Sequence, residues 1–291
     1  MTSTLAAALA DARTAGLDRL DAQLLLAHVL QRPRSWLLAH DTDLLAPQDA
    51  AAFRAAVARR AAGEPLAYIT GRKEFHGLSL QVDASVLVPR PDTETLVDWA
   101  LEHLGAHEAS TVVDLGTGSG AIALALKHAR PAAHVHAVDA SAAALATARA
   151  NAARLHLDLR FHHGDWWTAV GGQRFQLAVS NPPYIAEGDP HLAALQAEPV
   201  MALTSGADGL DAIRRIVADA PAHLEPGAWL LVEHGHDQAD AVAMLLRNAG
   251  FDAVCSRQDL AGVNRCTGGR WVAMQSKQSD TTRAASPHPA A

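Results

Sequence analysis

Cysteine is almost absent from this sequence: among 291 residues only Cys255 and Cys266 occur. Two cysteines cannot build the disulfide framework of a small secreted domain or a zinc site made of cysteine ligands. The 16 histidines do not fill that gap, because none of their closest groupings joins a cysteine or carboxylate at a metal-ligand spacing. We therefore expect no metal site, and a reducing cytoplasm as the location.

Long apolar runs and an excess of positive charge are also missing. No stretch reaches the roughly 18 apolar residues of a membrane span, and the first residues resemble no signal peptide. Lys and Arg number 24 against 31 Asp and Glu, a formal net charge of −7. Nucleic-acid binders usually gather positive charge to neutralise phosphates. We therefore expect neither a membrane partner nor direct nucleic-acid binding.

Apolar residues make up 49% of the chain, enough for a sizeable core and more than one domain. Helical spacing falls first on Leu17, Leu20, Leu24 and Ala27, and again on Phe53, Val57 and Ala61. Residues 1–64 are therefore predicted to form a small helical domain. Strict alternation at Leu78, Leu80 and Val82 then predicts a β-hairpin, which makes residues 65–88 a linker between two domains.

From residue 89 to 275 strands and helices alternate, which predicts an α/β domain with a mostly parallel sheet covered on both faces. We expect strands at 111–115, 135–138, 175–179 and 228–232, and helices at 121–129, 141–155 and 237–248. Two edge strands at 251–256 and 270–274 would close the sheet, with Gly262, Gly268 and Gly269 in the connection between them. Residues 276–291 have almost no large apolar residue and are predicted to be disordered.

A glycine loop lies between the first of these strands and its helix: Gly116, Thr117, Gly118, Ser119 and Gly120. Glycines allow a close approach to a ligand, and the helix start offers free N–H groups. Asp139 closes the second strand 19 residues after Gly120, where a carboxylate can accept both hydroxyls of a ribose. The loop predicts a nucleoside-cofactor site, although by itself it also satisfies the dinucleotide fingerprint.

The tetrad Asn181-Pro182-Pro183-Tyr184 follows the next strand and should reach the same edge of the sheet. Consecutive prolines restrict the backbone, so that carbonyl groups are held outward as acceptors. With the Asn181 side-chain oxygen, two acceptors can hold the two hydrogens of one planar NH₂ group, and Tyr184 would form an aromatic wall. The tetrad therefore indicates a device that orients an amide or an aromatic amine.

These motifs resemble the HemK/PrmC family of S-adenosylmethionine-dependent protein glutamine N5-methyltransferases, which modify the GGQ glutamine of class-1 peptide chain release factors. The similarity spans residues 1 to about 274, and it rests on the glycine loop, the tetrad and the segments 63–71, 74–75, 88–94, 164–166, 233–235 and 269–270. One departure is His76, where the family usually has an aromatic residue. The resemblance implies a Rossmann-like methyltransferase domain behind a helical N-terminal domain that docks the release factor.

The same resemblance implies a role for each site residue. The methionine end of S-adenosylmethionine would lie on residues 116–120, its ribose on Asp139, and its adenine beside Asp165 and Trp166. The substrate glutamine would lie on Asn181, Pro182, Pro183 and Tyr184, with Asn181, Pro182 and Tyr184 as catalytic residues and Asn181 also beside the cofactor. Pro89, Arg90 and Thr93 would cover the pocket, with Arg90 near the substrate. A monomer is expected.

Three other interpretations stay open at this point. A sister branch that modifies a ribosomal-protein glutamine shares the tetrad, but the segment Pro91-Asp92-Thr93-Glu94 favours the release-factor branch. Adenine-N6 methyltransferases of DNA or RNA use a related tetrad on a flipped base, and the negative charge disfavours them. The third interpretation is a non-catalytic binding module. The intact glycine loop, Asp139 and tetrad argue against it.

Overall fold

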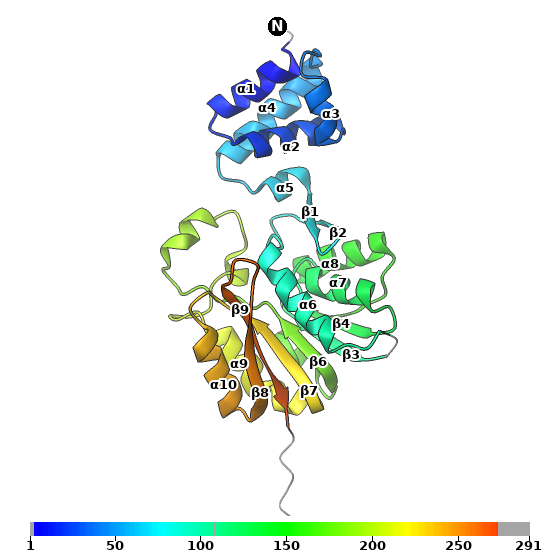
Figure 1. Cartoon of the computed structure of the whole chain (residues 1–291), viewed down its shortest axis with the longest axis vertical. Coiled ribbons are helices and arrows are strands. Elements are labelled where there is room, and N and C mark those ends of the chain that lie inside the picture. Colours follow the sequence, from blue (N-terminus) through cyan, green and yellow to red (C-terminus); the bar gives the residue numbers. More distant parts are fainter. Residues whose placement is uncertain (1–2, 107–108, 273–291) are drawn as a thin grey trace, which may run out of the picture.

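The computed structural model describes residues 3–106 and 109–272 (Figure 1). The predicted disordered segment 276–291 lies outside these residues. The helices are α1 (Leu5–Thr14), α2 (Arg19–Leu30), α3 (Arg34–Ala39), α4 (Pro47–Ala61), α5 (Leu66–Thr70), α6 (Glu94–Glu102), α7 (Ala121–Ala129), α8 (Ala142–Leu155), α9 (Asp211–His223) and α10 (Ala239–Asn248). The strands are β1 (Arg72–Phe75), β2 (Leu78–Gln81), β3 (Thr111–Leu115), β4 (His134–Asp139), β5 (Arg160–His163), β6 (Phe175–Ser180), β7 (Leu224–Glu233), β8 (Phe251–Gln258) and β9 (Asn264–Trp271).

Helices α1 to α4 form a separate bundle above the sheet in Figure 1. The side chain of Thr4 caps α1, and that of Asp18 caps α2, each by accepting a backbone N–H that the helix cannot satisfy. The predicted stripe on α2 was wrong in part, because Leu20 is 48% exposed while Leu25 and Leu26 are fully buried. The register of the buried face depends on the neighbouring helices as well as on spacing.

The short helix α5 and the hairpin β1–β2 connect the bundle to the sheet. Ile69 of α5 belongs to the core of the helical bundle, whereas Tyr68 packs beside Val86 and Val88 on the other side. The Tyr68 hydroxyl donates a hydrogen bond of 2.5 Å to the backbone oxygen of Val86. Since α5 contributes to both cores, the domain boundaries at residues 64 and 88 stay a prediction.

The central sheet has seven strands in the order β5-β4-β3-β6-β7-β9-β8, and β9 alone runs in the direction opposite to the other six. The next strand after β3 in the chain, β4, pairs with one edge of β3, whereas β6 pairs with the other edge. The loops at the carboxyl ends of β3 and β6 therefore diverge, and such a point in an open sheet leaves a crevice for a ligand. The predicted α/β fold with a mostly parallel sheet is confirmed.

Two apolar cores cover the two faces of the sheet. One packs α6, α7 and α8 against alternate strand residues such as Val112 and Leu177. The other packs α9 and α10 against the residues between them, such as Val113 and Ala178. Within the described part of the chain, no helix has the length and apolar character needed to span a membrane.

The last strand differs from its prediction, since β9 begins at Asn264 and not at residue 270. Gly268 and Gly269 lie inside this strand rather than in the connection before it. A Cβ on Gly268 would stand 2.5 Å from a methyl carbon of Leu231, and one on Gly269 would stand 2.9 Å from the Cβ of Phe251. These glycines allow close packing, not a turn. Residues 273 and 274 of the predicted strand lie outside the described residues.

Candidate active site

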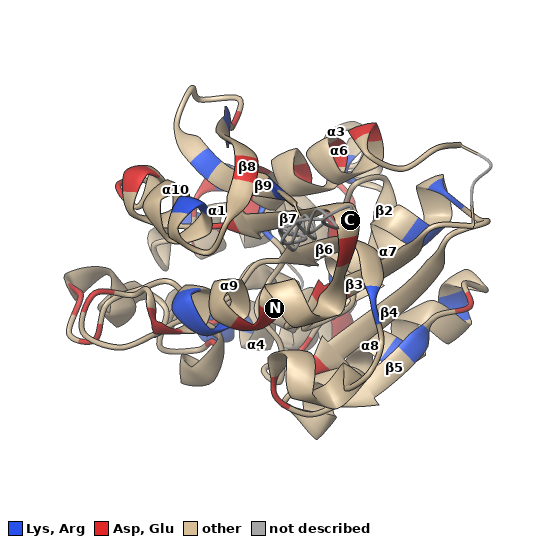
Figure 2. Ribbon diagram, turned by 90° about the horizontal axis from the view of Figure 1, so that it is seen from below, with Lys and Arg blue, Asp and Glu red and all other residues tan. Residues whose placement is uncertain are grey.

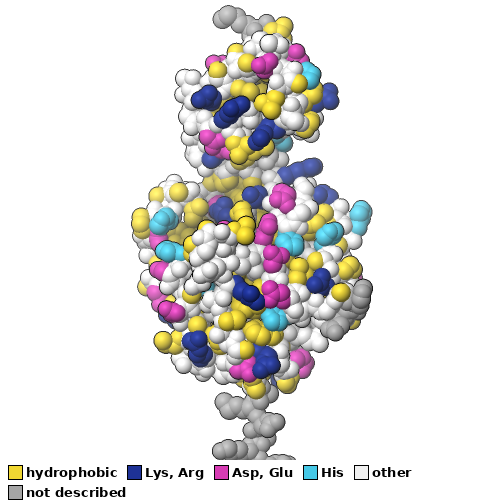
Figure 3. Space-filling view, in the orientation of Figure 1, with side chains coloured by type: hydrophobic (Ala, Val, Ile, Leu, Met, Phe, Trp, Pro, Cys, Tyr) yellow, Lys and Arg dark blue, Asp and Glu magenta, His cyan; other side chains and the backbone are white. Residues whose placement is uncertain are grey.

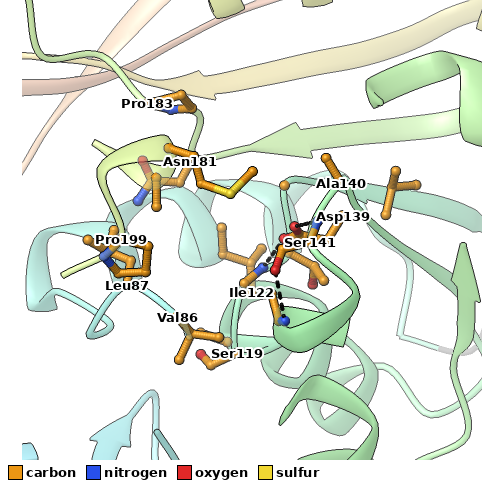
Figure 4. Close-up of a pocket in the computed structure, with 18 of the residues that line it drawn as sticks. Val86, Leu87, Ser119, Ile122, Asp139, Ala140, Ser141, Asn181, Pro183 and Pro199 are labelled. Atoms are coloured by element: carbon orange, nitrogen blue, oxygen red, sulfur yellow. Dashed lines mark hydrogen bonds between the residues drawn. The ribbon is translucent and has the colours of Figure 1, made fainter. Parts of the chain in front are cut away.

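A cavity opens at the carboxyl ends of β3, β4 and β6, the crevice that the strand order predicts (Figure 4). It encloses about 980 Å³, its open mouth included. Of the site residues predicted from sequence, it is lined by Pro89, Arg90, Thr93, Gly116, Thr117, Gly118, Ser119, Asp139, Asp165, Trp166, Asn181 and Pro183.

The glycine loop forms the floor of this cavity. The backbone N–H groups of Gly116 and Thr117 both donate to the backbone oxygen of Val138, at 2.9 and 2.8 Å, which ties β3 to β4. Gly120 does not line the cavity; it precedes α7 with φ of +85°, where a Cβ would meet a methyl carbon of Leu124 at 2.9 Å. Gly120 therefore serves the close packing that lets α7 start beneath the loop.

Asp139 ends β4 with its carboxylate directed into the cavity (Figure 4). One carboxylate oxygen accepts the N–H of Gly118 and the other accepts the N–H of Ser141, each at 2.8 Å. Burial raises the pKa of Asp139, and these two backbone hydrogen bonds oppose the rise. Each oxygen keeps a second lone pair, so the carboxylate can still accept two hydroxyls of a ribose.

Asp165 and Trp166 form a further wall of the cavity. The Trp166 ring lies so close to Gly116 that a Cβ there would stand 3.1 Å from it. One carboxylate oxygen of Asp165 is paired with Arg215 on α9. The wall thus offers an aromatic face and one remaining carboxylate oxygen, which suits a planar base with an amino group.

The tetrad divides between the cavity and the core. Asn181 and Pro183 line the cavity, and Figure 4 places Asn181 on the side opposite Asp139. Pro182 is buried. Tyr184 is not among the lining residues; it packs against the α9–α10 core, and its hydroxyl donates to a carboxylate oxygen of Glu233 at 3.4 Å. Burial raises the pKa of Tyr184, next to the charge of Glu233, so this phenol stays protonated at neutral pH.

A loop between Tyr184 and α9 covers one side of the cavity, and the sequence had given no sign of this role. Pro199, Met201 and Ala202 of this loop line the cavity. The buried carboxylate of Glu198 accepts the N–H of Val88 at 3.0 Å and pairs with the guanidinium of Arg90. Arg90 therefore holds this loop while it lines the cavity.

The residues present suit a nucleoside ligand. Ser119 lines the cavity, and its buried hydroxyl oxygen has no hydrogen-bond partner within the described part of the chain. A buried polar atom without a partner costs free energy unless a ligand or water satisfies it. Together with the free lone pairs of Asp139 and the ring of Trp166, it makes a cradle for a ribose and a base. Among residues 3–106 and 109–272, no group of His, Cys, Asp and Glu could hold a metal ion.

The chain matches two protein families, the PrmC N-terminal domain over residues 3–71 and the methyltransferase small domain over residues 93–204. A release factor glutamine methyltransferase of Bordetella pertussis is 53% identical over 257 residues, 87% of this chain and 95% of that protein. Another of the same name from Xylella fastidiosa is 50% identical over 266 residues, 90% of this chain and 97% of that one.

Solved structures also resemble the fold. A 16S rRNA methyltransferase of T. thermophilus, in complex with AdoMet and guanosine, matches with a TM-score of 0.53 and 20% identity. The match covers 68% of this chain and 49% of that one. At this identity the likeness concerns the fold alone, and it agrees with the sheet described above.

Proposed function

Because this chain belongs to the release factor glutamine methyltransferase family, we propose that it methylates the side-chain amide nitrogen, N5, of the glutamine in the GGQ motif of class-1 peptide chain release factors. The methyl donor is S-adenosylmethionine, the cofactor of this methyltransferase family. The observation that carries the proposal is that Asn181 and Asp139 line the same cavity from opposite sides. Asp139 ends β4 and Asn181 follows β6, and these strands are the two neighbours of β3, so about 10 Å separates the two backbones.

This separation lets one cavity hold both reactants. In the proposal Asp139 accepts the ribose hydroxyls, the glycine loop lies along the methionine end, and Asp165 and Trp166 hold the adenine. The glutamine side chain enters from the side of Asn181. The donor and acceptor atoms can then approach in line, and most of the rate enhancement comes from positioning.

The acceptor nitrogen needs help because the lone pair of an amide is delocalised. We propose that Asn181 Oδ1 and the backbone oxygen of Pro182 accept its two N–H hydrogens, which turns the nitrogen towards the methyl group. The two oxygens also favour the positive charge that develops on the nitrogen. When bound, S-adenosylmethionine supplies a methyl group made electrophilic by a positively charged sulfur.

The bonds balance without further reactants. A nitrogen–carbon bond forms as the sulfur–carbon bond breaks, and the sulfur leaves as a neutral thioether. The methylated nitrogen is strongly acidic and releases one proton to water, so no general base is required. Pro183 lines the entry beside Asn181, while Tyr184 supports the tetrad from behind in the structure and is proposed to act through that support.

Substrate choice follows from the segment before α6 and from charge. The segment Pro91-Asp92-Thr93-Glu94 favours a release factor over a ribosomal protein. Lys and Arg lie scattered among Asp and Glu in Figure 2 and form no single strip, and the net charge is −7. A nucleic-acid substrate would need such a strip to neutralise its phosphates. We propose no direct nucleic-acid partner.

The partner is proposed to lie across both parts of the molecule. Figure 3 shows a narrow neck between the helical bundle and the larger part, with hydrophobic side chains gathered on its surface. A folded protein substrate can dock on the bundle while its glutamine reaches the cavity. We propose that the enzyme acts as a monomer, and in the cytoplasm because release factors work at the ribosome there.

The proposal is tested by incubating the protein with methyl-labelled S-adenosylmethionine and, separately, a purified class-1 release factor, a ribosomal protein and DNA. We expect label on the release factor, at the glutamine of its GGQ motif by mass spectrometry. Label on the ribosomal protein or on DNA with none on the release factor would refute it.

A further inference from the structure

The side-chain amide of Asn181 can act only in one of its two orientations. Its Oδ1 and Nδ2 ends have nearly the same size, but an oxygen accepts from the substrate NH₂ whereas an NH₂ group repels it. In the structure Nδ2 of Asn181 donates to Oγ1 of Thr93 at 3.1 Å. Thr93 stands 88 residues earlier in the chain, just before α6, and is 4% exposed. The contact leaves Oδ1 of Asn181 for the substrate.

A buried carboxylate lies behind this pair. Glu233 ends β7, is 1% exposed, and receives the Tyr184 hydroxyl on Oε1. Its Oε2 has no hydrogen-bond partner of good geometry among the described residues. Burial raises the pKa of Glu233 to about 7, and the hydroxyl of Thr93 lies close enough to lower it as a hydrogen-bond donor. The Thr93 hydroxyl is thus placed between a carboxylate and an amide.

The chemistry of these groups fixes the direction of the chain of hydrogen bonds. Above about pH 7, where Glu233 is mostly ionised, its carboxylate only accepts, so the hydroxyl hydrogen of Thr93 turns towards it. Oγ1 is then left with lone pairs, which accept from an NH₂ group and repel a carbonyl oxygen. The NH₂ end of Asn181 must therefore face Thr93. Without the carboxylate, Thr93 could donate to Asn181 instead, and the amide could turn its NH₂ group into the cavity.

We propose that Thr93 and Glu233 are positioning residues that lock the side-chain amide of Asn181 with its oxygen facing the substrate nitrogen, a role that rests on the proposed glutamine methylation. The lock acts on the orientation of Asn181 and not on the cofactor. It also accounts for a carboxyl group kept in a buried position, where ionisation is unfavourable.

The test is a double-mutant cycle on the full chain, with single-turnover methylation of a release factor and calorimetric cofactor binding as readouts. Thr93→Val removes the hydroxyl at nearly constant shape, and Thr93→Ser is the matched variant that keeps it. We expect Thr93→Val to lower the rate at least about tenfold, with cofactor affinity within about twofold of the unchanged protein. Thr93→Ser should retain about a third of the rate or more.

The double-mutant cycle distinguishes a role of Thr93 that acts through Asn181 from a role that is independent of Asn181. In an Asn181→Ala background there is no amide left to orient, so Thr93→Val should lower the rate less than about twofold further. Glu233→Gln can donate as well as accept, so it should lower the rate at least about threefold while Asn181 is present and have little effect once it is absent.

Two results would overturn the inference. One is additivity of Thr93→Val and Asn181→Ala, and the other is an equal loss in Thr93→Val and Thr93→Ser. Failure of this inference would appear as additivity in an enzyme that methylates. Failure of the proposed function would appear as no methylation by the unchanged protein, which would overturn both.

Discussion

Replacing Asp139 with alanine should weaken the binding of S-adenosylmethionine at least tenfold. The carboxylate is proposed to accept two ribose hydroxyls, and hydrogen bonds to a charged group contribute roughly 1.5–3 kcal/mol. By the usual conversion this corresponds to about a 10- to 150-fold loss of affinity. The proposed ribose contact alone therefore predicts a change that calorimetry resolves easily.

Two further hydrogen bonds of Asp139 in the structure favour the larger of these losses of affinity. The two carboxylate oxygens of Asp139 also accept the N–H groups of Gly118 and Ser141, each at 2.8 Å. Alanine frees both N–H groups, so the glycine loop loses one of its ties to β4. Asp139→Asn keeps one acceptor but turns an NH₂ group towards one of these N–H groups. We therefore expect an intermediate loss for asparagine.

The assay is isothermal calorimetry with S-adenosylmethionine on variants that retain the thermal unfolding transition. Asp158→Ala is a matched control, because it removes the same charge from an exposed position before β5. The control should bind like the unchanged protein. Unchanged affinity in folded Asp139→Ala would refute the assignment of Asp139 to the ribose.

Three further predictions follow from other parts of the molecule. Removal of residues 1–64 should preserve cofactor binding but slow methylation of an intact release factor; a full rate would contradict the docking role. Glu198→Ala should speed cofactor dissociation several-fold in stopped-flow measurements, because it releases the loop that Arg90 holds; an unchanged rate would contradict this. Burial lowers the pKa of His136 from 6.5 to about 4. Between pH 6.5 and pH 4 the unfolded chain therefore binds a proton at this residue that the folded protein does not. As the pH falls from 7 to 4, the protein should lose up to about 3 kcal/mol of unfolding free energy relative to His136→Phe; a constant difference in urea titrations would contradict this.

Local patterns predicted the parts of the site that depend on neighbouring residues. The glycine loop, Asp139 and the tetrad each follow a strand with a clear apolar pattern. In a parallel sheet the carboxyl ends of strands share one edge, so the structure brings Gly118, Asp139 and Asn181 to one cavity. The strand order also set the crevice between β3 and β6.

Long-range contacts could not be predicted in this way. Thr93 and Asn181 are 88 residues apart, and Arg90 and Glu198 are 108 apart, with no spacing that links them. Tyr184 was expected at the cavity, yet its aromatic character suits the core equally well, and the structure places it there. Its hydroxyl donates to Glu233, which the sequence analysis placed just after a predicted strand and within the family segment 233–235, without a partner.

Some elements were missed for local reasons. Helix α9 contains Pro221, which normally ends a helix, so the segment 211–223 gave no clear prediction. Strand β5 has only four residues, two of them histidines, and lacks an apolar alternation. Gly268 and Gly269 suggested a connection, whereas the short distances to Leu231 and Phe251 show that they allow close packing inside β9.

Asn181 is proposed to orient the substrate amide rather than the cofactor. This role is tested by single-turnover methylation of a release factor by Asn181→Ala, with cofactor affinity measured on the same preparation. Loss of one positioned contact in the transition state typically lowers the rate by about 10²–10³, or roughly 2.7–4 kcal/mol. We expect a rate loss of this size, with affinity for S-adenosylmethionine reduced far less. Near-normal turnover, or a loss of affinity as large as the loss of rate, would contradict it.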